Sequence, residues 1–189
     1  MKKIGLLSDT HGFLDPKIKS YFSEVDEIWH AGDIGSIEVL DELKAFKPTR
    51  AVWGNIDDIE IRRETNEFLR FNIESVSILM THIGGKPEKY AKPALNELQK
   101  NGTPNLFVCG HSHITLVKMD RRFKMLWMNP GACGYKGFHK VKTILRFKIV
   151  MVVITLIMFL MLLEKVHPAK LKLMVLIRPL QQLLLTDKL

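Results

Sequence analysis

Cysteine is scarce in this chain of 189 residues, which contains only Cys109 and Cys133. Two cysteines cannot form a disulfide framework, and neither belongs to a Cys-x-x-Cys pair of the kind found in zinc and redox sites. The chain is nevertheless long enough to bury a sizeable core without cross-links. We therefore expect one domain of ordinary size whose stability does not depend on disulfides.

The sequence also lacks an apolar run of about 20 residues, the length that a membrane-spanning helix needs. The longest run free of Gly, Pro and charge is residues 150–163, VMVVITLIMFLMLL. A lysine pair precedes a short apolar run at the start of the chain, but Asp9 and His11 interrupt that run too early for a signal peptide. These features predict a cytoplasmic protein with no membrane partner.

Charge of one sign is not concentrated anywhere, although the net charge is +8. Lysines and arginines are spread along the chain, and the densest short cluster before the last quarter is DRRFK at residues 120–124. Dispersed charge is typical of a solvated surface rather than of a nucleic-acid interface. We therefore expect no specific nucleic-acid partner.

Residues 1–149 and 150–189 differ in composition, because the second segment is rich in leucine, has no glycine and has poor helical periodicity. In a shifted reading frame, its Met, Val and Ile codons would mostly encode Asp, Asn, Gly and Val, giving a turn and a closing strand. We interpret residues 150–189 as a frameshift product rather than a domain. An amphipathic membrane anchor and a dimerising helix, which would make a homo-oligomer, are the alternatives.

Residues 1–149 contain short apolar runs between turn-forming residues, and eight of these runs are typical of strands: 3–8, 27–32, 50–55, 68–73, 76–82, 105–111, 125–131 and 143–149. Three segments have apolar residues near helical spacing: 16–24, 36–46 and 87–101, the last followed by Gly102 as a stop. The early alternation of strand and helix predicts an α/β fold with parallel strands. The later, hairpin-like strands predict a second sheet.

Five turns carry side chains that can bind metal, and each turn follows an apolar strand. They are SDTHG (8–12), HAGDIG (30–35), WGNIDD (53–58), MTHIGG (80–85) and CGHSH (109–113). Open α/β sheets place their ligand sites at the carboxyl ends of strands. We therefore expect the five turns to converge on one crevice.

The candidate ligands in these turns are two carboxylates, one amide and four imidazoles: Asp9, His11, Asp33, Asn55, His82, His111 and His113. One metal ion does not need seven protein ligands, whereas two ions that share a carboxylate do. Mixed nitrogen and oxygen ligands suit Mn²⁺, Fe²⁺, Zn²⁺, Co²⁺ or Ni²⁺ better than Ca²⁺. We expect two divalent transition metal ions, with manganese as the first choice.

The remaining histidines and Cys133 are not expected to bind metal or to take part in catalysis. His30 lies within an apolar strand and is expected to be packed or hydrogen-bonded in the core, while His139 and His167 are expected on the surface. Pro130 and Gly131 predict a structural turn in MNPGACG (128–134), with Cys133 as a small residue and not a nucleophile.

The series D-x-H, GD, GN, H and GHxH resembles the calcineurin-like metallophosphoesterases. The segments LLSDTHG, HAGD, GNID, MTHIG, GHSH and MNPGA are most similar to small YfcE-type phosphodiesterases, and the resemblance covers residues 1–149. It implies a two-sheet αββα sandwich. It also implies one metal held by Asp9, His11, Asp33 and His113, and another held by Asp33, Asn55, His82 and His111.

By the same resemblance, the protein is a metal-dependent phosphoric diester hydrolase in which a bridging hydroxide attacks a small phosphodiester. Asp33 would bridge the two metals, with Asn55 and His82 as further catalytic residues. Many relatives have histidine directly after this asparagine, where it can protonate the leaving group, but Ile56 stands there in this chain. We therefore expect a preference for acidic leaving groups.

Two further interpretations depend on neighbouring features of the sequence. Asp57 is expected to orient a ligand or to cap the next turn rather than to bind metal. The main alternative to an enzyme is a protein-binding scaffold, because the superfamily includes a retromer subunit of the same fold with degraded metal ligands. All seven ligand positions are intact here, which favours the enzyme. A nuclease would need additional substrate-capping elements.

Overall fold

The computed structural model describes residues 1–150 and 153–161. The strands are β1 (Lys2–Leu7), β2 (Glu27–His30), β3 (Thr49–Ala51), β4 (Phe68–Ile73), β5 (Val76–Thr81), β6 (Gly85–Lys86), β7 (Lys89–Tyr90), β8 (Leu106–Val108), β9 (Thr115–Asp120), β10 (Met125–Pro130), β11 (Lys142–Val150) and β12 (Val153–Met161). The helices are α1 (Lys17–Tyr21), α2 (Ile37–Phe46), α3 (Ile59–Glu64) and α4 (Lys92–Asn101).

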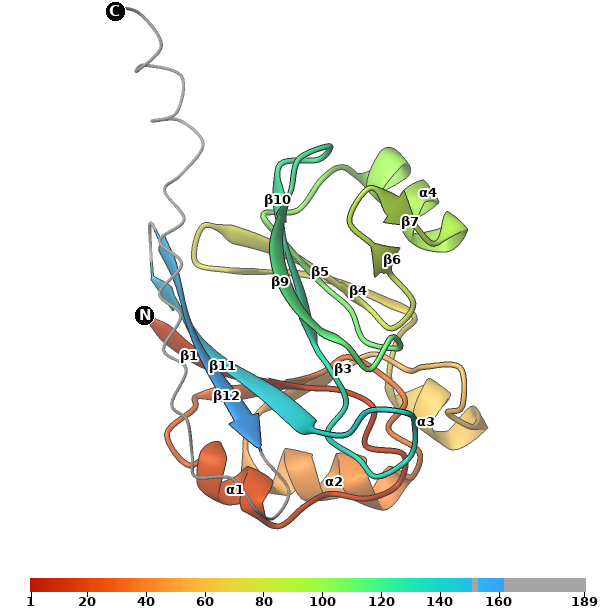
Figure 1. Ribbon diagram of the computed structural model, residues 1–189, viewed down its shortest axis with the longest axis vertical. Coiled ribbons are helices and arrows are strands. Elements are labelled where there is room, and N and C mark those ends of the chain that lie inside the picture. The colour runs from red at the N-terminus through yellow and green to blue at the C-terminus, as the bar shows by residue number, and fades with distance from the viewer. Residues whose placement is uncertain (151–152, 162–189) are drawn as a thin grey trace, which may run out of the picture.

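Two five-stranded sheets face each other, with helices on their outer sides (Figure 1). The first sheet has the order β12-β11-β1-β2-β3, in which β1, β2 and β3 are parallel. The second has the order β4-β5-β8-β10-β9, in which β5, β8 and β10 are parallel. Helices α1 and α2 cover the first sheet, and α4 with the β6–β7 ribbon covers the second (Figure 1). This architecture is the αββα sandwich expected from the sequence.

Three buried apolar clusters fill the spaces between these layers. One cluster lies between the sheets and contains Trp29 and Met128, another lies beneath α1 and α2 and contains Leu40, and the third joins Trp127 to Leu98 of α4. Burial of apolar surface is the main favourable term in folding. The core therefore stabilises both sheets and fixes the strand ends from which the ligand loops leave.

All eight predicted strands form, within a few residues of their expected bounds, and β4, β5, β8 and β10 belong to the predicted second sheet. The last predicted strand, β11, instead pairs with β1 in the first sheet. The helix expected over 87–101 is wrong in its first part, because Lys89–Tyr90 pairs as β7 with β6 and α4 begins at Lys92. Gly102 ends α4 as predicted, with a φ of 83°. The sequence patterns did not predict α3, β6, β7, β9 or β12.

Helix α3 is short, and its start depends on one side chain. Asp58 is its N-cap, and its carboxylate accepts hydrogen bonds from the backbone N–H groups of Glu60 and Ile61, each at 3.1 Å. Such a cap satisfies two of the donors that a helix N-terminus leaves without an intrahelical partner. The cap therefore fixes the end of the ligand loop that contains Asn55, where the chain enters α3.

Strand β12 lies at the edge of the first sheet and pairs antiparallel with β11, from Val150 opposite Val153 to Lys142 opposite Met161. Residues 153–161 thus form a strand rather than a helix. Residues 151–152 and 162–189 lie outside the described residues, so the frameshift interpretation of 150–189 stays a prediction. No helix within the described ranges is long and apolar enough to cross a membrane.

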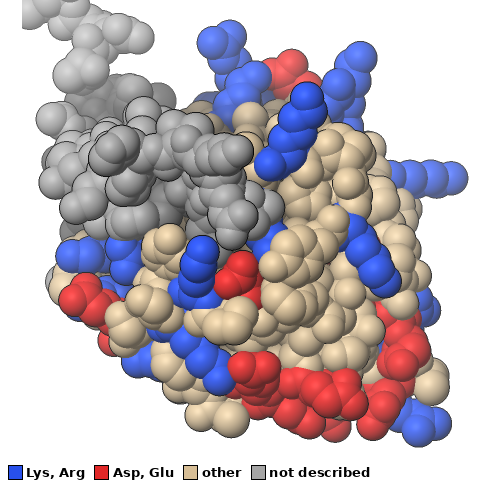
Figure 2. Space-filling model, turned by 60° about the horizontal axis from the view of Figure 1, so that its bottom comes forward, with Lys and Arg blue, Asp and Glu red and all other residues tan. Residues whose placement is uncertain are grey.

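Lysines and arginines are dispersed over the face that Figure 2 presents, and acidic side chains gather along one edge of it. No continuous basic surface covers the described part of this face (Figure 2). The picture agrees with the dispersed charge of the sequence, and the absence of a specific nucleic-acid partner stays a prediction.

Candidate metal centre

The predicted ligands all follow parallel strands, at the end of the sandwich where α3 lies (Figure 1). Three strands of the first sheet precede Asp9 with His11, Asp33 and Asn55, and two strands of the second sheet precede His82 and the GHSH segment. The carboxyl ends of parallel strands open at the same edge of a sheet, and here the two sheets bring their loops together. The expected convergence is therefore a consequence of the topology.

Most of the predicted ligands project from a left-handed backbone, a conformation that is uncommon outside glycine. Eight described non-glycine residues have positive φ, and five of these are predicted ligands: Asp9 (57°), His11 (51°), Asp33 (55°), His111 (68°) and His113 (57°). Backbone strain of this kind persists only where the surrounding structure enforces it, and it concentrates at functional sites. The left-handed backbone at these positions therefore sets the direction in which the ligand side chains point.

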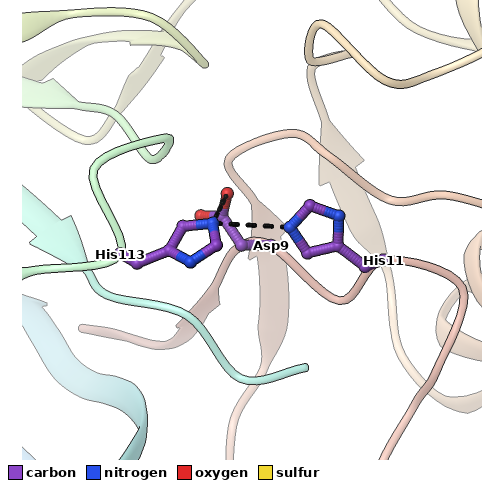
Figure 3. A group of neighbouring side chains, drawn as sticks. All are labelled: Asp9, His11 and His113. Carbon is purple, nitrogen blue, oxygen red and sulfur yellow. Dashed lines mark hydrogen bonds and ion pairs between the residues drawn. The ribbon is translucent and has the colours of Figure 1, made fainter. Parts of the chain in front are cut away.

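Asp9, His11 and His113 form the first cluster (Figure 3). Nε2 of His113 lies 3.2 Å from Oδ1 of Asp9 and 3.4 Å from Nε2 of His11. The two histidines approach the buried carboxylate from opposite sides, one from the loop after β1 and the other from the loop after β8 (Figure 3). Their ring nitrogens face one another across a space of the size that one ion occupies.

Asp33, His82 and His111 form the second cluster. Oδ1 of Asp33 lies 3.2 Å from Nε2 of His82, while Oδ2 lies 4.0 Å from Nε2 of His11 in the first cluster. The backbone N–H of His111 donates to Oδ2 of Asp9 at 3.2 Å, which also joins the two clusters. The two oxygens of Asp33 therefore face different clusters, as a bridging carboxylate requires.

Asn55 is exposed and lies between two residues whose backbones contact Asp33. The N–H of Ile56 donates to Oδ1 of Asp33 at 3.2 Å. Gly54 lies so close to Asp33 that an added Cβ would be 2.1 Å from Oδ1. The structure thus places the backbone of Asn55 beside the second cluster, where its amide was expected.

Hydrogen bonds fix the tautomers of two ligand histidines. Nδ1 of His82 lies 2.8 Å from the carbonyl oxygen of Ala31, which can only accept, so in the neutral ring Nδ1 carries the proton and Nε2 keeps its lone pair. His139 acts on His113 in the same way: its Nε2 lies 3.0 Å from the carbonyl of Gly134, and its Nδ1 lies 3.2 Å from Nδ1 of His113. Partners of this kind orient metal-binding imidazoles.

His139 was expected to be a surface residue without a partner, and this expectation is wrong. It is partly buried against His113, in the segment between β10 and β11. Sequence analysis had no motif that joins His139 to GHSH, because the two segments meet only through the pairing of β10 with β8 and β9. The nearby glycines in GYKGFH were the available signal of a close approach.

Two buried polar atoms within the described residues have no hydrogen-bond partner, and there is one in each cluster. They are Oδ1 of Asp9 and Nε2 of His82, whose nearest oppositely charged groups lie at ion-pair distance without hydrogen-bond geometry. An unsatisfied buried polar atom costs about 1–3 kcal/mol, which coordination of a cation would offset. The residues present therefore fit a pair of metal ions.

Burial and neighbouring carboxylates move the pKa values of these groups in different directions. Burial lowers the pKa values of His11 and His111, which favours their neutral, metal-binding form. Burial also opposes a charge on His82, but Asp33 and Asp9 together outweigh it and raise the pKa of His82, as a contact with Asp9 raises that of His113. Protons and metal ions therefore compete for the same nitrogens, so metal affinity falls as pH decreases.

The loops of the centre are held by two further side chains. Asp57 accepts hydrogen bonds from the N–H groups of Gly35 and Gly54, both at 2.7 Å, and so ties the loop of Asp33 to the loop of Asn55. Asn129 donates to the carbonyl of Gly110 at 2.7 Å and accepts from Gly131. The structural turn in MNPGACG is confirmed, whereas Asp57 contacts the backbones of two ligand loops rather than a ligand side chain, and Asp58 caps the next helix.

His30 is a core residue, as predicted, and Cys133, expected to be a small residue in a turn, is buried too. Nδ1 of His30 accepts from the N–H of Gly32 at 3.2 Å, and its Nε2 lies 2.9 Å from Oγ1 of Thr10, so the neutral ring is satisfied on both sides. Burial raises the pKa of the Cys133 thiol to about 12, so the thiolate needed for nucleophilic attack is not formed at neutral pH.

The free energy of unfolding of the metal-free protein should depend on pH through His30. Burial lowers the pKa of His30 from 6.5 to about 3, so between these values the unfolded chain binds a proton that the folded chain does not. Stability from His30 is complete above the unfolded pKa and is lost as pH falls, by about 1.4 kcal/mol per pH unit. Urea unfolding at about pH 7.5 and about pH 5.5 should show a loss larger by about 1.4 kcal/mol in the wild type than in His30→Asn. Equal losses would contradict the buried, neutral assignment.

Comparison with known proteins places the chain in a family. A profile described as the calcineurin-like phosphoesterase superfamily domain matches residues 1–151. A probable metallophosphoesterase of Methanocaldococcus jannaschii is 33% identical over 148 residues, which cover 73% of this chain and 74% of that protein. Another, from Methanothermobacter thermautotrophicus, is 29% identical over 137 residues, covering 68% and 76%.

Solved structures share the fold. A novel archaeal phosphodiesterase superposes with a TM-score of 0.60 and 25% identity, covering 77% of this chain and 93% of its own. Vacuolar protein sorting 29 of Cryptosporidium parvum superposes with a TM-score of 0.74 and 17% identity, covering 94% and 98%. The latter identity supports similarity of fold alone. From the matched profile, the curated relatives and the architecture together, this chain belongs to the calcineurin-like phosphoesterase superfamily.

Proposed function

We propose that this protein hydrolyses small phosphodiesters with two divalent transition metal ions, manganese being the first candidate, held by the seven predicted ligands. The observation that carries the proposal is the pair of ligand clusters, each with one buried ligand atom that lacks a hydrogen-bond partner. The family and the similarity to an archaeal phosphodiesterase support the same reaction class.

The ligands would divide into Asp9, His11, Asp33 and His113 for one ion, and Asp33, Asn55, His82 and His111 for the other. When bound, such ions neutralise phosphate oxygens and lower the pKa of a water nucleophile. The chain itself supplies position: Ala31 and His139 fix the rings of His82 and His113, and Asp57 holds two of the ligand loops together. Pre-organised groups of this kind need no rearrangement during reaction.

Ile56 limits the choice of leaving group. This side chain is 46% exposed at the rim of the centre and has no proton to donate. A leaving group that departs without protonation must be acidic, because general-acid catalysis, worth about 10²–10⁴-fold, is absent at this position. The proposed substrates are therefore phosphodiesters whose leaving alcohol or phenol has a low pKa.

A protein-binding scaffold is the alternative function. Its support is the similarity of fold to vacuolar protein sorting 29, at an identity of 17% that carries no argument about activity. A structure of the Entamoeba histolytica protein of that name is described as a complex with Zn²⁺, so metal binding alone does not separate the two functions. Catalytic turnover is therefore the deciding readout.

Hydrolysis of 4-nitrophenyl esters after reconstitution with Mn²⁺ tests the proposal. We expect turnover of bis(4-nitrophenyl) phosphate, slower turnover of the 4-nitrophenyl monoester, and much slower turnover of diphenyl phosphate, whose leaving group is less acidic. His113→Ala should abolish the activity, whereas Asp41→Asn, at an exposed position on α2, should retain it. Metal-loaded protein without turnover of any diester would favour the scaffold.

A further inference from the structure

Exposed apolar side chains surround the candidate metal centre. Nine large apolar side chains are exposed among the described residues, and four of them lie within two positions of a predicted ligand: Phe13, Ile56, Ile83 and Ile114. Two more, Tyr135 and Phe138, lie in the segment 134–140 that contacts His113. Exposed apolar groups concentrated around a polar site are typical of a ligand-binding surface.

Segment 134–140 is fixed to the metal centre at several points. The N–H of Gly134 donates to the carbonyl of Asp9 at 3.0 Å, and His139 contacts Nδ1 of His113. Gly137 packs so closely that an added Cβ would lie 2.2 Å from Nδ1 of His113. The ring of Phe138 stacks on His113 with centroids 5.8 Å apart. The aromatic residues of this segment therefore have a defined position relative to the ligands.

Phe13 and Tyr135 form an exposed aromatic pair beside the first cluster, with ring centroids 4.5 Å apart. Nζ of Lys142 lies 3.2 Å from the centroid of Tyr135 and pairs with Asp15 at 3.1 Å. Lys142 is only 1% exposed, so this cation supports the pair from the protein side. Tyr135 is 58% exposed and presents its remaining surface to solvent.

A positive charge adjoins the aromatic pair. Lys136 follows Tyr135 directly and is exposed. The residues on either side of it fix this segment to the first cluster, since Gly134 donates to the carbonyl of Asp9 and His139 contacts His113. An aromatic surface and a cation next to the same cluster together match a molecule that has an anionic phosphate and a planar ring.

We propose that Phe13 and Tyr135 bind an aromatic ester group of the phosphodiester substrate, while Lys136 contacts its phosphate. This inference rests on the proposed function, since it assigns the substrate class of the same centre. Aromatic rings attract one another in stacked or edge-to-face arrangements beyond the effect of the apolar area that they bury. The aromatic group should therefore raise affinity about tenfold over an apolar group of similar size.

Calorimetric titration of the Mn²⁺-loaded protein with diphenyl phosphate and dicyclohexyl phosphate tests this inference. We expect diphenyl phosphate to bind about tenfold more tightly. Tyr135→Ala should remove this preference, and Tyr135→Phe should keep it. Met119→Ala, which removes another exposed apolar side chain at the far end of β9, should leave both dissociation constants unchanged.

Equal affinity for the two diesters, or tighter binding of dicyclohexyl phosphate, would overturn the aromatic assignment. An unchanged preference in Tyr135→Ala would overturn it as well. Binding is measured directly, so these outcomes do not depend on turnover. Failure of the proposed function would instead appear as aromatic preference without hydrolysis of any diester.

Discussion

Replacing Asp33 with asparagine is expected to lower kcat/KM for bis(4-nitrophenyl) phosphate by about 10³-fold, because loss of the shared carboxylate removes several kcal/mol of charge stabilisation. The two oxygens of Asp33 face the imidazoles of different clusters, Oδ1 toward His82 and Oδ2 toward His11. Asparagine keeps the shape of the side chain but offers one neutral oxygen in place of two charged ones. Both ions should therefore be affected, and steady-state kinetics with saturating Mn²⁺ measure the effect.

Thermal unfolding separates this effect from a loss of fold. The metal-free variant should unfold near the wild-type temperature, because the substitution weakens the contact of Asp33 with His82 but also removes the cost of burying a charged carboxylate. The rise in Tm on adding Mn²⁺ should be large in the wild type and nearly absent in Asp33→Asn. Asp41→Asn is the matched control. Wild-type kinetics in Asp33→Asn would exclude the bridging role.

Gly54→Ala is expected to lower activity by about 10²-fold and stability by about 3 kcal/mol. An added Cβ would lie 2.4 Å from the backbone nitrogen of Asp33 and 2.8 Å from Cδ2 of His82. Backbone cannot give way as a flexible side chain does, so the loop of Asn55 must move away from the centre. Urea unfolding and kinetics of the same preparation measure the two losses.

Gly102→Ala is the appropriate control for this substitution. Gly102 ends α4 with a φ of 83°, and an added Cβ would have no neighbour within 4 Å. Its cost is backbone strain alone, about 1 kcal/mol, at a distance from the ligands. We expect normal activity in Gly102→Ala. If Gly54→Ala is equally active, the close packing of Gly54 against Asp33 does not position the centre.

Most strands and the ligand loops that follow them were predictable. Apolar runs that end in glycine-containing turns indicate buried strands, and open α/β sheets place their ligand sites at the carboxyl ends of strands. Most of the elements that were missed are short or only partly buried, whereas β12 lies in the apolar run that was interpreted as a frameshift product. Helix α3 depends on the Asp58 cap, and β9 (Thr115–Asp120) is only partly buried, so neither leaves a strong apolar pattern. The residues of β7 were included in the helix that was expected over residues 87–101.

The ligand clusters follow from motifs, but their supporting contacts do not. His111 and His113 are separated by one residue but belong to different clusters. The sequence predicted this division through the resemblance to a family. The contact of His139 with His113 joins residues 26 positions apart and has no periodic signal. The Phe13–Tyr135 pair spans most of the chain and exists only because β1 and β11 are neighbours. Tertiary contacts of this kind require the fold to be known.

The central claim is that the two clusters hold two metal ions that share Asp33. Titration of metal-free protein with Mn²⁺, followed by electron paramagnetic resonance, tests it most directly. The account predicts that two Mn²⁺ bind per chain and give the spectrum of a spin-coupled pair, which is lost in Asp33→Asn. Binding of a single Mn²⁺ per chain, or of two ions with independent spectra, would contradict it.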